Sequence, residues 1–386
     1  MDQTLKQKIG VLAPSVVNQS FFCLSTVIVQ MARTFSEADL STVQLVFTLP
    51  SLTITLASLV AGKLACRFHK KTLLLTGLLM TAVGGTAGFF LSFSLGALLA
   101  CSAVIGLGVG LNLTLSYAII CDYYTGSERG KLMGLNTSFV CMGGVFFSFL
   151  GGALASVAGW SAVYLGFLLL LPVAALVWRW CPPGLLEGQD QRQGRLGLSG
   201  YFLLLTGLGF VCYTFQNGFN ANSSLYLSEL GRYTPALASL SSICNSGGGI
   251  IGGLLFGWLL SRLKHQIQSA AYLLSGVGFA LLCLLRAMPT VMAGGFVIGF
   301  AFALVNAGSS ILIADHASPQ SRSMLLAIYN AVVNVGASVS PYVVNPLSGL
   351  VENSALGRYT VVTVAMLACG VASVCFQAVS HKKTPA

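Results

Sequence analysis

Tyr213, Gln216, Asn217 and Asn220 are polar side chains that recur at the spacing i, i+3, i+4 and i+7 within an apolar stretch. This spacing places all four on one face of a helix. Phenol and carboxamide groups exchange hydrogen bonds without carrying charge at neutral pH, so this face suits an uncharged or weakly polar ligand. An unsatisfied amide in an apolar environment costs several kcal/mol. The face must therefore meet protein, water or a ligand, and hydrogen bonding between helices remains the alternative.

Other amides stand singly in apolar stretches, and we expect them to belong to the same binding region. They are Asn18, Gln19, Asn112, Asn136, Asn306, Asn330 and Asn334. The ten acidic residues and four histidines all fall in polar segments or at their edges. The 11 cysteines are scattered through apolar runs without the paired spacing of metal or disulfide sites. The pattern indicates no catalytic residues, no metal and no cofactor.

Charged residues are rare, since the 20 Lys and Arg and the 10 Asp and Glu make up 8% of the 386 residues, against about 25% in soluble domains. Apolar residues make up 55%, and the mean hydropathy is +0.83. A chain of this size could not cover a water-exposed surface with so little charge. The composition excludes soluble enzymes and nucleic-acid binders and indicates a membrane protein.

Long apolar stretches separated by short polar ones run through the whole chain. A membrane-spanning helix needs about 20 mostly apolar residues, and breaks at charge, proline and glycine clusters leave twelve stretches of roughly that length. They cover residues 9–32, 42–64, 72–92, 95–121, 132–157, 161–181, 201–227, 235–260, 268–287, 290–314, 323–347 and 358–379. We therefore predict an all-α membrane protein with twelve transmembrane helices.

Basic residues are distributed unevenly between the two sets of loops. Alternate numbering of the loops places 16 of the 20 Lys and Arg residues on one side. The other side receives Arg33, Arg232, Arg286 and Arg358. Because basic loops are retained in the cytoplasm, both termini are predicted to be cytoplasmic. The same distribution accounts for the net charge of +10 without a nucleic-acid partner.

Two polar patterns occur once in each half of the chain, with offsets of 193 and 195 residues. The matching pairs are Asp122–Arg129 with Asp315–Arg322, and Gly62–Arg67 with Gly257–Arg262. Both offsets are close to half of the chain length, which indicates a duplication. The sequence thus predicts a six-helix bundle over residues 1–181, a cytoplasmic linker over 182–199 and a second six-helix bundle over 200–386.

The stretch Gly62-Lys-Leu-Ala-Cys-Arg-Phe-His-Lys-Lys71 resembles the signature loop of the major facilitator superfamily, G-x-L-a-D-R-x-G-R-K. Cys66 stands at the position of the family's usual Asp, and His69 at that of its Gly. Asp122 and Arg129 match the acidic end of the family's fourth helix and the Arg that follows it. The resemblance covers essentially the whole chain.

This resemblance implies two bundles that rock about a binding site at mid-membrane. It places the first, fourth, seventh and tenth helices around a central cavity, with the fifth and eleventh at its border, and so assigns the amides above to substrate binding. It also implies gate roles for charged residues at the helix ends, where ion pairs break and re-form as the bundles move. These are Arg67, Lys70, Asp122, Arg129, Arg262, Asp315 and Arg322. Arg67 or Lys70 is expected to pair with Asp122, and Arg262 or Lys264 with Asp315.

The expected function is secondary transport of a small neutral or weakly polar organic solute by alternating access. The alternative is a proton-coupled multidrug or metabolite efflux antiporter. The motifs of such antiporters are degenerate here, since Ser102 stands where R-x-x-Q-G begins with Arg, and residues 143–152 lack the usual Gly-Pro. A channel, a membrane-embedded enzyme and a sensor are disfavoured, because no selectivity filter, deep nucleophile or signalling domain is visible. We expect a monomer in the cell membrane, the inner or plasma membrane of a bacterium, with the solute and the lipid bilayer as its partners.

Overall fold

The computed structural model describes residues 3–65, 67–124, 126–184, 200–263, 266–316 and 322–381, and these residues form helices without any β-strand. Ten helical stretches are long and apolar enough to cross a membrane. They are Leu40–Ala61, Lys70–Phe90, Leu95–Ile120, Ser138–Ala158, Trp160–Trp180, Phe202–Glu229, Pro235–Leu263, Ile267–Leu285, Met288–Ser309 and Ala355–Cys375. A bent pair, Leu5–Ser25 with Ile28–Thr34, is an eleventh candidate. The all-α membrane class is confirmed.

The predicted span 323–347 falls on α14 (Arg322–Ser348), which is not among these candidates in the described part of the chain. This helix contains Pro341 and Pro346 and several amides, which lower its apolar character. The count of twelve membrane helices therefore stays a prediction, and so does the location of the termini.

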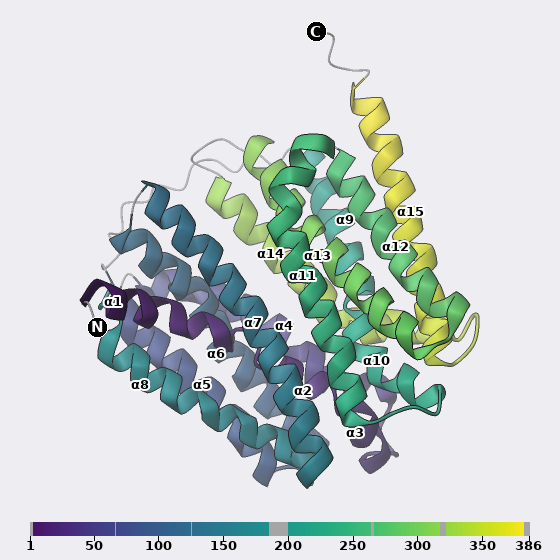
Figure 1. Cartoon of the computed structure of the whole chain (residues 1–386), viewed down its shortest axis with the longest axis horizontal. Coiled ribbons are helices and arrows are strands. Elements are labelled where there is room, and N and C mark those ends of the chain that lie inside the picture. The colour runs from purple at the N-terminus through teal and green to yellow at the C-terminus, as the bar shows by residue number, and fades with distance from the viewer. Residues whose placement is uncertain are drawn as a thin grey trace. The chain divides into compact units, whose positions relative to one another are not determined.

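The chain forms two compact units, which we call the N-terminal and C-terminal units. The first comprises Met1–Arg192 with Thr234–Ser239, and the second Gln193–Tyr233 with Leu240–Ala386. The N-terminal unit, coloured purple to teal in Figure 1, contains α1 (Gln3–Leu12), η1 (Ala13–Val17), α2 (Phe22–Ser25), α3 (Ile28–Thr34), α4 (Leu40–Ala65), α5 (Lys70–Phe90), α6 (Leu95–Tyr123), α7 (Gly126–Ala158), η2 (Trp160–Leu169) and α8 (Leu170–Trp180). The C-terminal unit contains α9 (Gly200–Gln216), α10 (Gly218–Glu229), most of α11 (Pro235–Leu263), α12 (Ile267–Leu285), α13 (Met288–His316), α14 and α15 (Ala355–His381).

The first predicted span, 9–32, is wrong as a single continuous helix. Its helical segments are bent by 48°, and the 3-10 helix η1 lies within the first of them. Backbone N–H groups here reach the carbonyl oxygen three residues back, as from Asn18 to Ser15 at 3.2 Å and from Phe22 to Gln19 at 3.1 Å. Pro14 lies in η1, and proline disrupts a regular α-helix because it lacks the N–H and its ring meets the preceding turn. Pro14 in the sequence is a sign of a kink, but apolar length alone does not indicate the tighter 3-10 winding.

Glycines bring α5 close to its neighbours in the N-terminal unit. A Cβ atom placed on Gly77 would lie 2.7 Å from the carbonyl oxygen of Gly108 in α6. About two and three turns farther along α5, Gly85 faces the ring of Phe167 and Gly88 that of Tyr164, both in η2. Because these glycines carry no side chain, a neighbouring backbone or aromatic ring can pack directly on α5, as is common between membrane helices.

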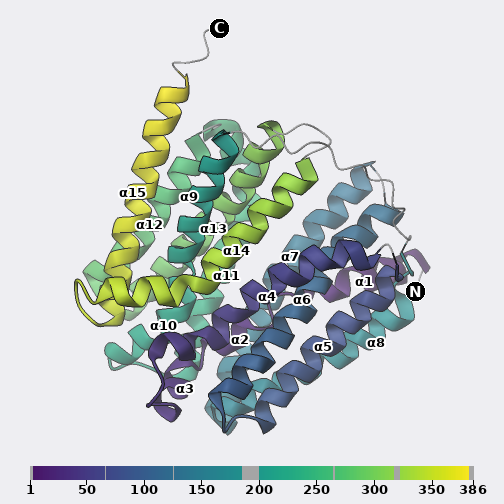
Figure 2. The same ribbon diagram turned by 180° about the vertical axis from the view of Figure 1, so that it is seen from behind.

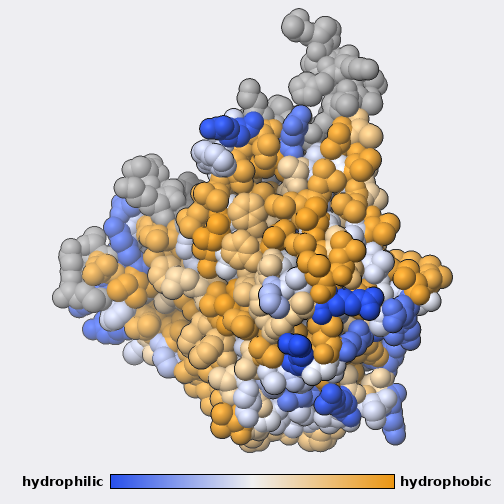
Figure 3. Space-filling model, turned by 45° about the vertical axis from the view of Figure 1, so that its right-hand side comes forward, coloured by the Kyte–Doolittle hydropathy of each residue, from blue (hydrophilic) through white to orange (hydrophobic). Residues whose placement is uncertain are grey.

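In the C-terminal unit, α15 runs alongside α12 in both ribbon views (Figures 1 and 2). The hydroxyl oxygens of Ser269 and Ser373 join these helices at 2.7 Å. On another side, α11 approaches α13 through glycine, since a Cβ atom on Gly252 would lie 2.7 Å from the carbonyl oxygen of Phe300. Large apolar side chains such as Leu254 and Val364 point outward. Figure 3 shows hydrophobic residues over much of the face it displays, as expected for a surface that meets lipid.

The duplicated Asp-to-Arg pattern lies at equivalent helix ends in the two halves. The bounds of α13 follow those of α6 by 193 residues at both ends, and Asp122 and Asp315 are each the penultimate residue of their helix. The offset found in the sequence is therefore also the offset of these two structural elements.

Candidate functional site

The predicted polar face of the seventh span lies on α9 and α10, which meet at Asn217. The ring of Tyr213 is buried, with its centroid 4.8 Å from that of Phe302 in α13. The Gln216 side chain is also buried, and its Nε2 atom donates to the carbonyl oxygen of Ile298 at 2.9 Å. These two side chains attach α9 to α13 within the C-terminal unit.

The other two members of this face reach different helices. Asn217 Nδ2 donates to the carbonyl oxygen of Ala337 in α14 at 2.9 Å. Asn220 Nδ2 lies 3.5 Å from Oδ1 of Asn245 in α11. The amide donors thus join helices to one another, which is the alternative that the sequence pattern left open. The buried Asn220 Oδ1 atom, in contrast, has no hydrogen-bond partner among the described residues.

In the N-terminal unit, Asn136 of α7 and the first span come together. The hydroxyl of Ser15 donates to Oδ1 of Asn136, and both residues are fully buried. Asn18 follows η1 and is only 4% exposed, yet neither atom of its amide finds a partner within the described chain. Gln19 beside it is half-buried. The irregular winding of the first span therefore carries an amide whose donor and acceptor capacity is unused.

Asn112 lies inside the N-terminal unit, between α6 and α5. A Cβ atom on Gly77 would lie 2.8 Å from Oδ1 of Asn112, so this amide fills the space that glycine leaves. Asn112 is fully buried, and both of its amide atoms are unpartnered in the part of the protein that the structure describes. Each buried unsatisfied group costs about 1–3 kcal/mol.

The amides predicted in the tenth and eleventh spans are more accessible. Asn306 in α13 and Asn330 in α14 are exposed. Asn334 is half-buried, and its Nδ2 atom donates to the carbonyl oxygen of Asn330 at 2.8 Å within the same helix. The Asn334 contact stays within α14, unlike the contacts of Gln216 and Asn217, which reach neighbouring helices.

Lys70 and Asp122 form an ion pair inside the N-terminal unit, and we call them the gate pair. Lys70 is the first residue of α5 and is 1% exposed. Its Nζ atom lies 2.9 Å from Oδ1 and 3.0 Å from Oδ2 of Asp122. A buried ammonium is unfavourable without a counter-charge, and the two carboxylate oxygens supply it. Of the two partners predicted for Asp122, the structure has Lys70, whereas Arg67 is exposed.

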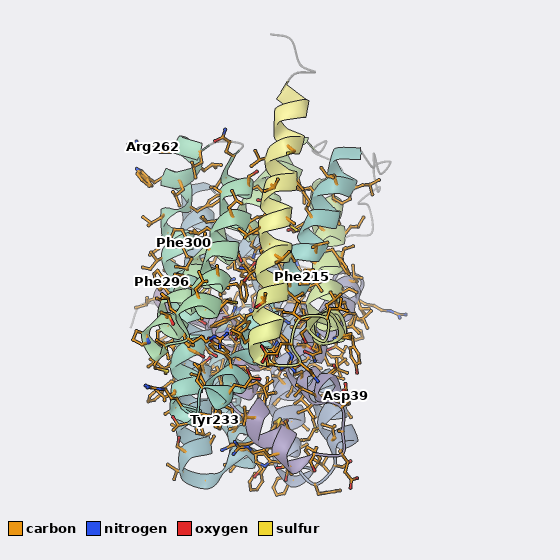
Figure 4. All side chains as sticks on the ribbon, turned by 90° about the vertical axis from the view of Figure 1, so that its right-hand side faces the viewer. Asp39, Phe215, Tyr233, Arg262, Phe296 and Phe300 are labelled. Atoms are coloured by element: carbon orange, nitrogen blue, oxygen red, sulfur yellow. The ribbon has the colours of Figure 1, made fainter. Side chains whose placement is uncertain are left out.

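The second predicted gate is described only in part. Arg262 lies at the end of α11, with its guanidinium carbon 5.4 Å from the centroid of the Trp258 ring. Figure 4 shows Arg262 toward one end of α11, with Phe296 and Phe300 of α13 farther along. Lys264 and the side chains of Arg129, Asp315 and Arg322 lie outside the described residues, so the pairing with Asp315 stays a prediction.

Sequence reasoning missed two charged contacts at the start of α15 in the C-terminal unit, one from buried Arg358 and one from Glu229. Arg358 was expected in a loop but is the fourth residue of α15 and is 5% exposed, and its Nη1 atom donates to Oδ1 of Asn222 at 3.3 Å. Glu229, the last residue of α10, accepts backbone N–H groups of Ala355 at 2.6 Å and Leu356 at 3.3 Å. A carboxylate at a helix N-terminus is favourable because it meets the positive end of the helix dipole. Asn222, a further amide two residues beyond Asn220, was the available signal.

The sequence matches the profile of the Major Facilitator Superfamily over residues 12–341 and again over residues 205–386. The chain belongs to the major facilitator superfamily. Among solved structures, this major facilitator chain resembles a bacterial homologue of the human lysosomal transporter Spinster, in an inward-facing and unoccupied conformation, with a TM-score of 0.76, 16% identity and coverage of 98% of this chain and 95% of that one. A D-xylose–proton symporter gives a TM-score of 0.76 at 15% identity, with coverage of 96% and 97%. At these identities the likeness concerns the fold.

Curated relatives of this major facilitator protein include an antibiotic resistance protein and a multidrug transporter. It is 29% identical over 172 residues to the methylenomycin A resistance protein of Bacillus subtilis, covering 43% of this chain and 35% of that protein. It is 31% identical over 109 residues to the multidrug transporter AQR1 of Candida glabrata, covering 28% and 18%. The chain thus spans about a third or less of the length of these relatives. The family match and the ten apolar helices among the described residues make the chain a multi-pass membrane protein, and the relatives and neighbours that are named as transporters favour transport over catalysis.

Proposed function

We propose that this major facilitator protein moves a small neutral or weakly polar organic solute across the cell membrane by alternating access. In this proposal, twelve spans form bundles over residues 1–181 and 200–386, residues 182–199 join them, and both termini are cytoplasmic. The solute binds at mid-membrane between Asn, Gln and Tyr side chains, and the protein acts as a monomer in a bacterial inner or plasma membrane.

The placement of charge carries this proposal. Every acidic residue in a described helix lies within three residues of the end of that helix. Examples are Asp122, Glu128 and Glu229. Amides and hydroxyls occupy the interior of the spans instead. A charged substrate at mid-membrane would need a counter-charge there, whereas an uncharged one needs only hydrogen-bond partners.

Unused hydrogen-bonding capacity supports the same view. Asn18 offers a donor and an acceptor that no described side chain engages, and Asn220 offers an acceptor. A solute with hydroxyl or amide groups would satisfy both kinds of site. A buried amide that lacks protein partners costs stability, so Asn18→Ala should not lower the midpoint of thermal unfolding. It should weaken solute binding about tenfold, the worth of one hydrogen bond of about 1.4 kcal/mol. Asn353→Ala, at an exposed loop position, is the matched control.

The alternative is an efflux antiporter for drugs or metabolites, coupled to protons. The relatives that carry resistance or multidrug names favour it. Proton coupling requires a carboxylate whose partner changes during the cycle, and Asp122, which is paired with Lys70, is the nearest inward candidate among the described residues.

Uptake into proteoliposomes, with a panel of neutral, cationic and anionic solutes and with or without an imposed pH gradient, separates the two proposals. Carrier action on a neutral solute predicts saturable uptake that the gradient does not accelerate. Strong acceleration by the gradient, with cationic or aromatic drugs preferred, would favour the antiporter and refute the first proposal.

A further inference from the structure

The residues that follow α8 fold over the start of α5. The carbonyl oxygen of Pro183 accepts a hydrogen bond from the backbone N–H of Lys71 at 3.1 Å. This N–H belongs to the first turn of α5, where N–H groups have no partner within their own helix. Residues Cys181–Gly184, which we call the strap, are therefore attached to the helix end that carries the gate pair.

Gly184 brings the strap against Lys70 itself. Gly184 is buried, and its φ of +77° is a backbone conformation that glycine adopts readily and other residues rarely do. A Cβ atom on Gly184 would lie 2.8 Å from Cβ of Lys70 and 3.2 Å from its Cγ and Cδ atoms. The aliphatic part of Lys70 thus packs directly on the strap backbone, while its Nζ atom meets Asp122.

Cys181, at the other end of the strap, is buried against α1. It is 3% exposed, and a Cβ atom on Gly10 of α1 would lie 2.6 Å from its backbone nitrogen. The strap is therefore fixed at both ends, against α1 at Cys181 and against α5 at Gly184. Together with Asp122 it encloses Lys70, which explains why a lysine at a helix start is 1% exposed.

We propose that the strap positions Lys70 for its ion pair with Asp122, and that Gly184 is the positioning residue that allows the strap to close. This inference rests on the proposed function, in which the gate pair controls alternating access. It adds that the gate pair is tied to the segment through which the chain continues toward the second bundle. Because coupling between two sites is reciprocal, opening the strap weakens the pair, and breaking the pair opens the strap.

Cys181 supplies a reporter of strap opening that does not depend on transport. Burial raises the pKa of the Cys181 thiol from 9.0 to about 12. Alkylating reagents attack the thiolate, whose share at pH 8 is about 10% for a pKa of 9.0 and about 0.01% for a pKa of 12. Release of the strap should therefore accelerate labelling of Cys181 by up to about 10³-fold.

The test measures N-ethylmaleimide labelling of Cys181 at pH 8 in the purified full-length protein, by peptide mass spectrometry. Gly184→Ala introduces both a strained φ and a contact with Lys70, so labelling should rise at least tenfold. Gly159→Ala is the matched control, because Gly159 has a φ of +84° but nothing within 4 Å of its Cβ position. It should leave Cys181 at the wild-type rate. Equal rates in Gly184→Ala and wild type, or equal acceleration in both glycine variants, would overturn the proposal.

Asp122→Asn tests the reciprocal direction. It should also accelerate labelling of Cys181, and the double variant with Gly184→Ala should label no faster than the faster single variant, since both changes open the same strap. Multiplying effects in the double variant would show that the two sites are independent and would contradict the proposal.

Buried Cys23, which is 2% exposed in the same unit, reports on global unfolding. If Gly184→Ala exposes Cys23 as well, Gly184→Asn replaces it, because asparagine tolerates a positive φ but still brings a side chain against Lys70. If both Gly184→Ala and Gly184→Asn expose Cys23 together with Cys181, Gly184 only stabilises the fold as a whole, and the inference is refuted. Fast labelling of Cys181 in Asp122→Asn together with normal transport would uphold the strap and refute only the gate role.

Discussion

Asp122→Asn isolates the contribution of the gate pair. The change keeps the shape of the side chain but removes the negative charge that two oxygens at 2.9 and 3.0 Å present to Lys70 Nζ. Lys70 stays 1% exposed, so its ammonium would remain buried without the counter-charge that Asp122 supplies. Removing one partner of a buried pair costs about 3–5 kcal/mol. The retained amide oxygen still accepts one hydrogen bond, which places the expected loss near the lower end, at about 3 kcal/mol.

This loss is large beside the total stability of about 5–15 kcal/mol that is typical of a folded protein. For a unit of this size it should lower the midpoint of thermal unfolding by about 6–12 °C, at 2–4 °C per kcal/mol. Lys70→Met combined with Asp122→Asn removes the uncompensated charge and should recover most of the loss. Neither variant can form the ion pair, so both should show reduced or shifted transport while still inserting into the membrane.

Thermal unfolding in detergent and uptake into proteoliposomes measure the two effects separately. Glu37→Gln is the control, because Glu37 is an exposed carboxylate whose loss should change stability by about 0.5 kcal/mol or less. A loss below about 1 kcal/mol in Asp122→Asn, or no recovery in the double variant, would contradict the view that a buried counter-charge holds Lys70.

Three further outcomes follow from other contacts. Glu229→Gln removes the charge at the start of α15 and should lower stability by about 0.3–1 kcal/mol, which thermal unfolding would detect, and an unchanged midpoint would contradict it. Gly85→Ala drives a methyl group into the ring of Phe167 and should cost about 1–3 kcal/mol, whereas Gly253→Ala, which meets nothing within 4 Å, should not destabilise. Because the pKa of the Cys181 thiol is raised from 9.0 to about 12, the unfolded chain ionises first, and the stability this site contributes is complete below pH 9 and lost between pH 9 and 12. Between pH 9 and 12 the free energy of unfolding should therefore fall more steeply in the wild type than in Cys181→Ala, by about 1.4 kcal/mol per pH unit. Equal slopes in the two proteins would show that the pKa of Cys181 is not raised by burial.

The helices and their approximate bounds could be predicted from the sequence, because a span must be long and apolar and polar residues must lie at its ends. The same reasoning placed Asp122 at the end of α6, where it pairs with Lys70. The rule that charge marks the end of a span misplaced the start of α15 at Arg358. This arginine lies inside the helix because Asn222, on another helix, accepts a hydrogen bond from it.

The partners of the predicted amides could not be derived from spacing. Helical periodicity puts Gln216 and Asn217 on a polar face, but the carbonyl oxygens that they reach, those of Ile298 and Ala337, belong to residues far away in the chain. Which carbonyl is available depends on how each neighbouring helix is rotated and kinked. The strap was hidden for a similar reason, because the short-range pattern Pro-Pro-Gly indicates only a turn and not the helix end that the turn covers.

The five residues of η1 also have a mechanical consequence. A 3-10 helix advances about 2.0 Å and turns about 120° per residue, whereas an α-helix advances about 1.5 Å and turns about 100°. Rewinding η1 as an α-helix would therefore shorten the first span by about 2.5 Å and swivel everything beyond it by about 100°. Asn18 directly follows η1, so such a change of pitch would carry its amide from one neighbouring surface to another, and it would also break the contact of Ser15 with Asn136.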